Sequence, residues 1–262
     1  MKSFIAVSLL AGSALASPLM DWAKAELQAR NAARRQGNVF RAKGDGGLGN
    51  ITATTVESSN WGGAAIVTSG VTEVAGTFTV PTPSAPSGGS SRTEYCGAAW
   101  VGIDGYSNSA LIQTGVLWCV ESGSYLYEAW YEYLPAALVE YSSFTVSAGS
   151  SVTVTATKTS STGGTTTITS GGKSTSHTFS GQSTQLQGAS AEWIVEDFTS
   201  GNSLVPFANF GTVTFTGATA IINGATVSAS SDSPVTIDLV SSSNSVLTST
   251  SISGSTVTVK YV

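Results

Sequence analysis

Two glutamates four residues apart are the most distinctive chemical feature of this sequence. Residues 191–198 read AEWIVEDF. Side chains of a β-strand alternate between its two faces, so Glu192, Ile194 and Glu196 share one face of a strand here. Such carboxylates are solvated on an edge strand, where they protect against aggregation, or they are paired, or they perform acid–base chemistry. The pattern alone leaves these alternatives open.

Other predicted strands also carry polar side chains among apolar ones. In ALIQTG, Gln113 shares a face with Leu111, and a structural amide is the simplest interpretation. In YEAWYEYL, Glu128, Trp130 and Glu132 share a face. Aromatic and acidic residues that alternate along a concave sheet are typical of a groove for an extended peptide or glycan. An amphipathic outer face explains the same pattern equally well.

The residue inventory argues against several catalytic mechanisms. The single histidine, His177, lies in a predicted hairpin (GGKSTSHTFSG) with no acid beside it, so its context does not favour a Ser-His-Asp triad. Neither HExxH nor CxxC is present, and no glycine-rich phosphate loop opens a helix. We therefore expect no metal and no cofactor. If the protein is an enzyme, carboxylates and amides carry its chemistry.

The composition favours an all-β domain. Only 10% of the residues are charged, whereas 41% are hydrophobic and six are tryptophan, which favours a packed core over a low-complexity wall protein. Short apolar runs separated by Gly, Ser and Pro turns are typical of an antiparallel sandwich. The predicted strands cover 60–67, 71–80, 98–103, 111–118, 125–134, 144–158, 165–168, 192–197, 213–215, 235–239 and 257–262.

The N-terminus has the features of an export signal. Residues 1–16 combine a basic start, a short apolar core and an ALA exit, which is typical of a secretory signal peptide. The apolar run is shorter than the ~20 residues that a membrane helix needs, so we expect no membrane anchor there. An exported chain with two cysteines, Cys96 and Cys119, is expected to form one disulfide.

The next segment, residues 17–55, differs in charge from the rest. It is basic, whereas downstream of Asn50 four basic residues face thirteen acidic ones, a formal charge of −9. A basic arm can bind nucleic acid. In an exported chain with an acidic body, a removable pro-segment is the better interpretation. We therefore predict a mature domain of residues 56–262 and no nucleic-acid partner.

Seven collinear motifs resemble one known family, the fungal glutamic peptidases or eqolisins. They run in order from about residue 58 to residue 262, and the pro-segment layout is also similar. The motifs are SSNWGGA, VAGTFTVP, AWVGIDG, QTGV, EAWYEYLP, AEWIVEDF and SLVPFANFGTVTF.

The resemblance implies a fold and a set of site residues. The implied fold is all-β, a bent antiparallel β-sandwich of two seven-stranded sheets of the concanavalin-like or jelly-roll type. Gln113 and Glu196 match the catalytic pair, while Leu134 stands where the family has a substrate-holding tyrosine. The residues that match the lining or support of the site are Trp100, Asp104 and Glu132, and Cys96 with Cys119 matches a family disulfide.

The resemblance also implies an activity. It is a secreted acid endopeptidase, made as a zymogen and insensitive to pepstatin, which acts on polypeptides and is inhibited by its own pro-segment. Glu196 is the expected general base for water, and Gln113 the expected donor to the oxyanion. We expect an extracellular monomer.

Two other functions remain open from the residues. A glycoside hydrolase needs two carboxylates about 5–9.5 Å apart, whereas four residues of strand separate Glu192 from Glu196 by about 13 Å. A pair of Glu196 and Glu132 across strands is still available to such an enzyme. The other function that remains open is not enzymatic: the protein would be a wall-associated lectin or an inactive homologue.

Overall fold

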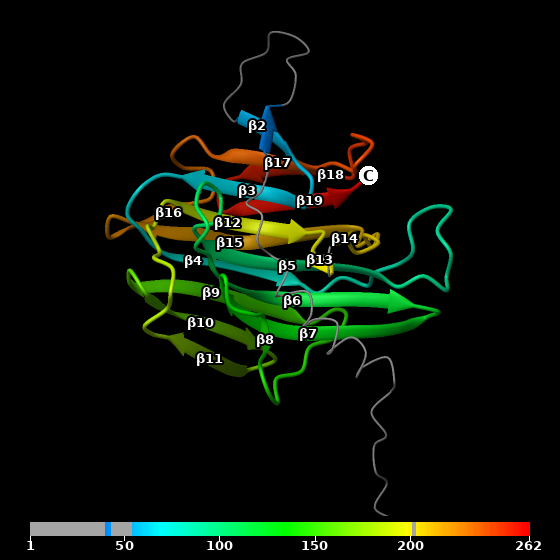
Figure 1. The fold of residues 1–262 in the computed structure, drawn as a ribbon, viewed down its shortest axis with the longest axis horizontal. Helices are drawn as coiled ribbons and strands as arrows, with labels where there is room; N and C mark the ends of the chain where they lie inside the picture. Colours follow the sequence, from blue (N-terminus) through cyan, green and yellow to red (C-terminus); the bar gives the residue numbers. More distant parts are fainter. Residues whose placement is uncertain (1–39, 43–53, 201–202) are drawn as a thin grey trace, which may run out of the picture.

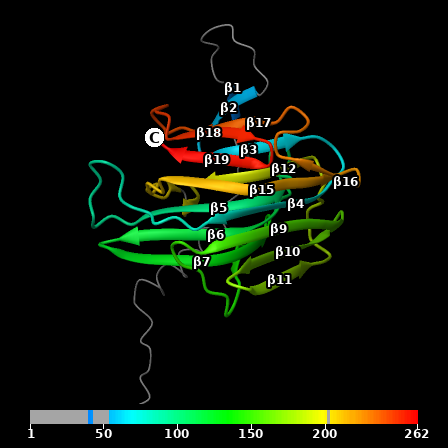
Figure 2. The same ribbon diagram turned by 180° about the vertical axis from the view of Figure 1, so that it is seen from behind.

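Two β-sheets packed face to face make up the fold (Figures 1 and 2). The computed structural model describes residues 40–42, 54–200 and 203–262, and these ranges contain nineteen strands and no helix. The nine-stranded sheet has the order β1 (Phe40–Ala42), β2 (Thr54–Ser58), β17 (Val235–Leu239), β3 (Trp61–Val67), β12 (Ser190–Glu196), β5 (Tyr95–Ile103), β6 (Ile112–Glu121), β7 (Ser124–Tyr133) and β8 (Val139–Glu140).

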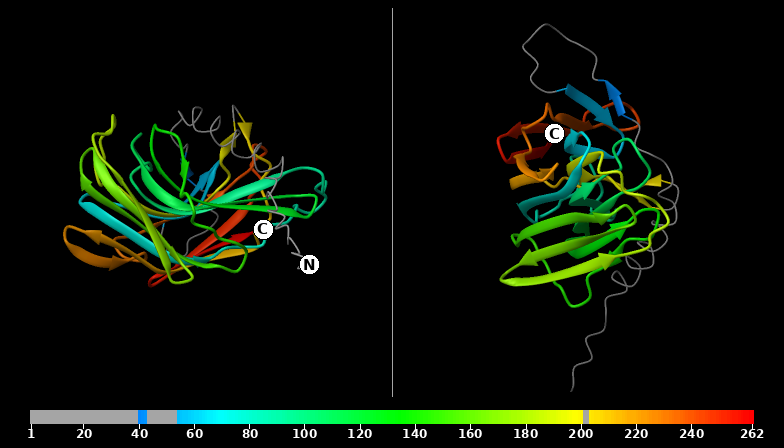
Figure 3. Two further views of the ribbon diagram at one scale, coloured as in Figure 1. Left: turned by 90° about the horizontal axis from the view of Figure 1, so that it is seen from below. Right: turned by 90° about the vertical axis from the view of Figure 1, so that its left-hand side faces the viewer.

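The second sheet lies behind the first as a separate curved layer (Figure 3). Its order is β11 (Lys173–Phe179), β10 (Gly163–Ser170), β9 (Ser151–Ser160), β4 (Val71–Thr79), β15 (Thr212–Ile222), β19 (Thr256–Tyr261) and β18 (Thr248–Ser253), with β16 (Ala225–Ser228) paired to β15. A separate hairpin joins β13 (Thr199–Ser200) to β14 (Ser203–Leu204).

The predicted all-β antiparallel sandwich is confirmed, with more strands than the two sets of seven that were expected. The nine-stranded sheet reduces to seven without the very short edge strands β1 and β8, and the other sheet is a path of seven strands plus β16. One pairing, between β2 and β17, is parallel. The sheets therefore extend the expected architecture at their edges.

One predicted strand begins later than expected, because a turn occupies its first residues. The strand expected over 144–158 begins only at Ser151, after an irregular stretch that contains left-handed Gly149. The hairpin predicted around His177 is confirmed as β10–β11, and the His177 ring stacks on Tyr131 of β7 at 4.0 Å between ring centroids. Strands β2, β16 and β18 were not predicted, because their Ser/Thr-rich sequences carry little apolar signal.

The main core lies between the two layers. It contains alternate residues of each sheet, among them Trp118 and Trp193 from one and Phe78 and Phe215 from the other. The Trp193 indole N–H also donates a hydrogen bond of 2.8 Å to the Ala75 carbonyl on β4 of the opposite sheet. Burial and this bond together fix which side of β12 faces the core.

A second apolar cluster lies on the other face of the nine-stranded sheet. Trp61, Trp100, Trp130 and Ile194 are its main members, and all are buried. Strand β12 pairs with β3 on one side and β5 on the other, and all seven of its residues are buried. The interpretation of AEWIVEDF as a solvated edge strand is therefore wrong.

Most of the N-terminal predictions fall outside the described residues. The expected signal peptide lies there entirely, and so does the pro-segment apart from β1 and the first residues of β2. In the described part of the chain, no helix is available to cross a membrane.

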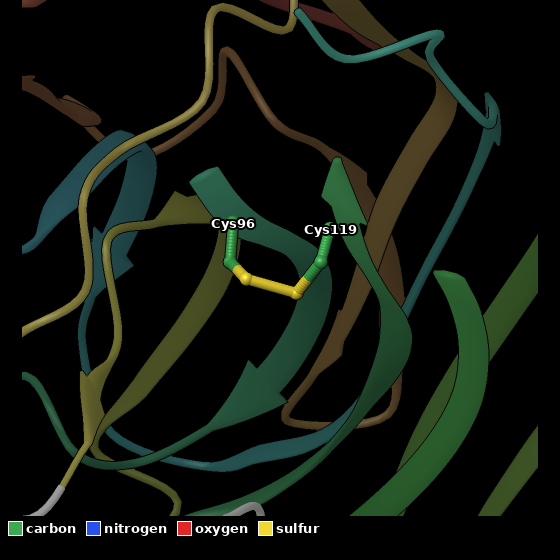
Figure 4. The surroundings of a disulfide bond; sticks show 2 residues. All are labelled: Cys96 and Cys119. Atoms are coloured by element: carbon green, nitrogen blue, oxygen red, sulfur yellow. A yellow bond between two sulfur atoms is a disulfide. The ribbon is translucent and has the colours of Figure 1, made fainter. Parts of the chain in front are cut away.

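The expected disulfide is confirmed between Cys96 and Cys119 (Figure 4). The two residues are directly opposed in the register of β5 and β6, the strands that carry Trp100 and Gln113. Glu94 brings an oxygen within 4.8 Å of both sulfurs. A disulfide lacks the thiolates that metal binding needs, so this group is not a metal site as it stands.

We predict that removing the disulfide destabilises the fold without altering the chemistry. A closed loop of this size contributes about 3 kcal/mol to the free energy of unfolding in the chain-entropy model. The Cys96→Ala/Cys119→Ala double variant should lose about that amount in urea unfolding at acid pH. An unchanged unfolding midpoint would show that the bond is energetically neutral.

Candidate active site

Three cross-strand rows of side chains build the face of the nine-stranded sheet that points away from the core. The register of β12, β5, β6 and β7 aligns them, and we call this surface the carboxylate face. The first row is Glu192, Gly102, Gln113 and Glu132; the second is Ile194, Trp100, Gly115 and Trp130; the third is Glu196, Ala98, Leu117 and Glu128. Polar rows thus flank a central row of tryptophans.

Gly115 makes room for the central tryptophan. A Cβ at this position would lie 2.1 Å from the Ala99 carbonyl and 2.6 Å from the Trp100 Cβ. Only glycine allows the two strands and the Trp100 side chain to come this close. Trp100 is fully buried, and the Trp61 ring meets its ring edge-on at 4.9 Å between centroids.

The Trp100 side chain holds the carboxylate of Glu196. Its indole N–H donates a hydrogen bond of 2.8 Å to Glu196 Oε2. Glu196 is only 4% exposed, and its register partners are Trp61 and Ala98. The bond fixes the rotation of the carboxylate, because it ties one of the two oxygens to a rigid ring.

The amide of Gln113 is oriented by Glu132. Gln113 Nε2 donates to Glu132 Oε2, and both residues are fully buried. Gln113 Oε1 has no hydrogen-bond partner among the described residues. A primary amide has two N–H groups, so one remains beyond the Glu132 bond to serve another acceptor.

Asp104 has a structural role in this arrangement. It follows the last residue of β5 in a left-handed conformation with φ of 72°, which removes it from the alternation that was expected to continue from Trp100. Its carboxylate accepts the backbone N–H groups of Gln187, Gly188 and Ala189 at 2.7–2.9 Å, and the Asn108 side-chain amide at 2.9 Å. Asp104 therefore supports the loop that leads into β12.

Two neighbours of the expected catalytic glutamate are buried acids with altered acidity. Burial raises the pKa of Glu192 well above its usual value, and the charge of Asp104 raises it further. The Ser190 hydroxyl beside Glu192 opposes this only in part, and it makes no hydrogen bond of good geometry with the described residues. Burial likewise raises the pKa of Asp197, with a contribution from Glu196.

The predicted pair, Gln113 and Glu196, lies on one face with Trp100 between its members. Their backbones are two strands apart, about 10 Å, and four residues apart along the strand, about 13 Å. Trp100 occupies the middle of this diagonal. The register therefore places Trp100 between the two members of the pair.

The glycosidase pairing receives no support from the register. Glu132 lies in the row of Gln113, three strands from Glu196, which is about 14 Å across the sheet. Glycosidase carboxylates stand about 5–9.5 Å apart. Glu132 is instead bonded to Gln113.

Comparisons with known proteins show what this chain is similar to. The profile of the peptidase A4 family matches residues 59–261, which include every strand of the carboxylate face. The chain belongs to the peptidase A4 family. Aspergillopepsin-2 from Aspergillus niger is 45% identical over 97% of both chains, and scytalidopepsin B from Scytalidium lignicola is 38% identical over 91% of this chain and 90% of its own.

Solved peptidase A4 structures share the fold. Scytalido-glutamic peptidase with a transition state analog inhibitor has a TM-score of 0.69 and 36% identity, covering 78% of this chain and 98% of its own. Aspergilloglutamic peptidase from Aspergillus niger has a TM-score of 0.61 and 48% identity, covering 64% and 99%. The protein is thus a glutamic endopeptidase, the enzyme class that the sequence motifs indicated.

Sequence reasoning missed three contributors to the site. Trp61 lies in the SSNWGGA motif but was given no role, although it packs against Trp100. Asp197 adjoins Glu196 and was overlooked because acids that follow a strand are usually solvated. Tyr106 lies in a loop, where alternation gives no orientation, yet its side chain packs against the cluster of the carboxylate face.

We predict that the fold is less stable at neutral than at acid pH. When a folded carboxyl has a raised pKa, the unfolded chain ionises first, so the free energy of unfolding falls as pH rises above about 4. Glu192, which faces Asp104 and Tyr106, and Asp197, which faces Glu196 and Tyr261, both act in this direction. Urea unfolding between pH 4 and pH 7 measures the effect.

The Glu192→Gln variant is the matched test of that dependence. It keeps the shape of the side chain and removes the titration, so its stability should fall less than that of the wild type over the same pH range. A wild-type free energy of unfolding that rises with pH would contradict the assignment, as would an unchanged slope in the variant.

Proposed function

We propose that this peptidase is a secreted acid endopeptidase, made as a zymogen, in which Glu196 and Gln113 hydrolyse peptide bonds without a covalent intermediate. One observation carries the proposal: each of the two side chains is oriented by its own buried partner on the same face, Glu196 by Trp100 and Gln113 by Glu132. Buried polar groups held in this way are pre-organised for chemistry.

Glu196 supplies the base in the proposed reaction. Its carboxylate takes a proton from a water molecule above Trp100, and the resulting hydroxide attacks the scissile carbonyl. The Trp100 bond keeps the carboxylate in one orientation during the attack. Glu196 then returns the proton to the departing amine, so that one group acts as base and acid in turn.

Gln113 supplies the donor for the oxyanion. Glu132 holds one N–H of the amide, and the other is directed to the oxygen on which negative charge develops. Removing one such donor typically costs about 3–4 kcal/mol of transition-state stabilisation. An amide does not titrate, so Gln113 keeps this role at the acid pH where a carboxylate is an effective base and acid.

The acidic body of the chain favours a basic inhibitor supplied by the same polypeptide. Strand β1 lies within the expected pro-segment and pairs antiparallel with β2 at the edge of the sheet that bears the site. Residues 17–50 are rich in Lys and Arg, whereas the rest carries the excess of acids. Both features support a pro-segment that acts on the domain to which it is joined. The basic start, short apolar core and ALA exit of residues 1–16 support an export route.

We predict that Glu196→Gln lowers kcat by at least about 10²–10⁴-fold on a denatured protein substrate at acid pH. The substitution preserves shape and hydrogen bonding but removes the base. Gln113→Ala should cost a comparable factor, because the oxyanion loses its donor. Steady-state kinetics together with thermal unfolding of each variant separate lost chemistry from lost folding.

Glu192→Gln is the control, since Glu192 has the same residue type, strand and face. It should affect stability much more than turnover. Pepstatin, which targets paired aspartates, should leave the wild type active. An inactive Glu192→Gln beside an active Glu196→Gln would move the base to the other glutamate.

We also predict that maturation of the precursor is faster in acid than at neutral pH. Protonation of the carboxylates near pH 4 weakens their attraction to the basic segment, which then releases. Gel analysis of purified precursor over time measures the rate. The Arg34→Gln/Arg35→Gln precursor should mature with a weaker pH dependence, and equal rates at both pH values in the wild type would disprove the gating.

A further inference from the structure

We propose that Tyr141 positions the Gln113 amide from the opposite face of the sheet, because its hydroxyl braces the two strands that carry Gln113 and Glu132. The inference deepens the proposed function and rests on it in one respect, the role of Gln113 as donor to the oxyanion. Tyr141 follows β8 and is buried in the inter-sheet core, so it acts on the reaction only through other residues. It is a positioning residue, not a catalytic one.

Three hydroxyl groups form a chain across the inter-sheet core, behind the row of Gln113. Tyr141 Oη donates a hydrogen bond of 2.9 Å to Thr166 Oγ1 on β10. The same oxygen lies 3.3 Å from Thr114 Oγ1 on β6. The Thr114 hydroxyl in turn donates a bond of 2.7 Å to the Trp130 carbonyl on β7. The chain therefore joins β10 of one sheet to β6 and β7 of the other.

The burial of these hydroxyls in an apolar core calls for an explanation. Thr114 and Thr166 are fully buried, and Tyr141 is only 3% exposed. A valine has nearly the shape of a threonine and needs no hydrogen-bond partner, so packing alone does not account for two buried threonines. A buried polar network whose members are bonded to one another makes its surroundings rigid and selects one arrangement of them. The chain therefore fixes the geometry of the strands that it joins.

The register places this chain next to the Gln113 amide. Thr114 pairs with Tyr131, and the adjacent pair of the ladder is Gln113 with Glu132. Successive residues of a strand point to opposite faces, so the Thr114 bond to β7 lies on the core side and the Gln113 bond to Glu132 on the carboxylate face. Both bonds depend on the separation of β6 and β7 at this point. A change that loosens the first therefore loosens the second.

Tyr141 also holds β7 through its backbone and its ring. Its N–H donates to the Ala129 carbonyl at 2.9 Å. Its ring packs against Tyr131 at 4.8 Å between centroids and against Phe144 at 6.4 Å. Burial raises the pKa of Tyr141, so the hydroxyl keeps its proton and remains a donor throughout the acid and neutral range. Replacement by phenylalanine therefore removes the hydroxyl bonds and leaves the other contacts in place.

Tyr141→Phe tests the role of the hydroxyl. On a denatured protein substrate at acid pH it should lower kcat about tenfold with KM little changed, a smaller loss than the about 10²-fold that a 1 Å misplacement costs. The factor should be the same at each acid pH, because the Gln113 amide does not titrate. Steady-state kinetics over the acid range measure it. A shifted pH profile would mean that Tyr141 acts through Glu196 and would contradict the inference.

Tyr133→Phe is the matched control. Tyr133 is another buried tyrosine, on β7 itself, and its hydroxyl donates to the Thr184 carbonyl at 2.9 Å, in the loop between β11 and β12. This variant should lose a thermal stability comparable to that of Tyr141→Phe and keep its kcat. Equal losses of kcat in the two variants would show that any weakening of β7 is sufficient, and would overturn a specific role for Tyr141.

The Gln113→Ala background shows whether Tyr141 acts through Gln113. Once the amide is gone, Tyr141→Phe should cause no further loss of kcat, since two residues that act as one unit are not additive. A loss in the double variant that multiplies the two single losses would overturn the inference and leave the role of Gln113 intact.

Nuclear magnetic resonance of the amide tests the positioning without turnover. In mature protein that contains isotope-labelled glutamine, the side-chain signals of Gln113 are assigned by their absence from Gln113→Ala. They should shift or broaden in Tyr141→Phe and stay in place in Tyr133→Phe. Unchanged Gln113 signals in Tyr141→Phe would refute the inference. This measurement decides it even if Gln113→Ala proved fully active, a result that by itself would refute only the proposed function.

Discussion

The anchoring of Trp193 between the sheets is the constraint on which the site depends. Its ring is buried in the inter-sheet core and its N–H is bonded to Ala75 of the opposite sheet. A slip of one residue along the strand would turn every side chain of β12 to the other face. The glutamates therefore have only one direction in which to point, away from the core, and packing on one side of the strand determines the chemistry on the other.

The same arrangement explains how acids can be buried beside tryptophans. Two glutamates on the carboxylate face accept hydrogen bonds there, Glu196 from Trp100 and Glu132 from Gln113. Among the described residues, Glu192 accepts no hydrogen bond of good geometry, and burial therefore favours its neutral form. The low dielectric of this buried face strengthens the hydrogen bonds to Glu196 and Glu132 and disfavours a negative charge on Glu192. The face is therefore most stable in an acidic medium.

Alternation and motif spacing predicted the faces of β12, β6 and β7, because a period of two is a local property of the chain. The rows that join Glu192 to Gln113 and Glu196 to Glu128 could not be predicted, since register depends on pairings between distant strands. Asp104 illustrates a second limit: its left-handed backbone breaks the alternation after Trp100. Tyr106 follows in a loop whose side-chain direction has no sequence signal, and Ser/Thr-rich edge strands lack the apolar contrast that marks a strand.

The stacking of His177 on Tyr131 provides an NMR signal that reports on one edge of the molecule. The chain has one histidine, and burial against these rings lowers its pKa. Its imidazole signals in a proton NMR spectrum are therefore unique, and the adjacent ring shifts them by its ring current. Tyr131 precedes Glu132 on β7 and projects from the opposite side of that strand. If a peptide bound to the carboxylate face displaces β7, the chemical shift of the His177 imidazole should change. This change can be measured without a label on the protein.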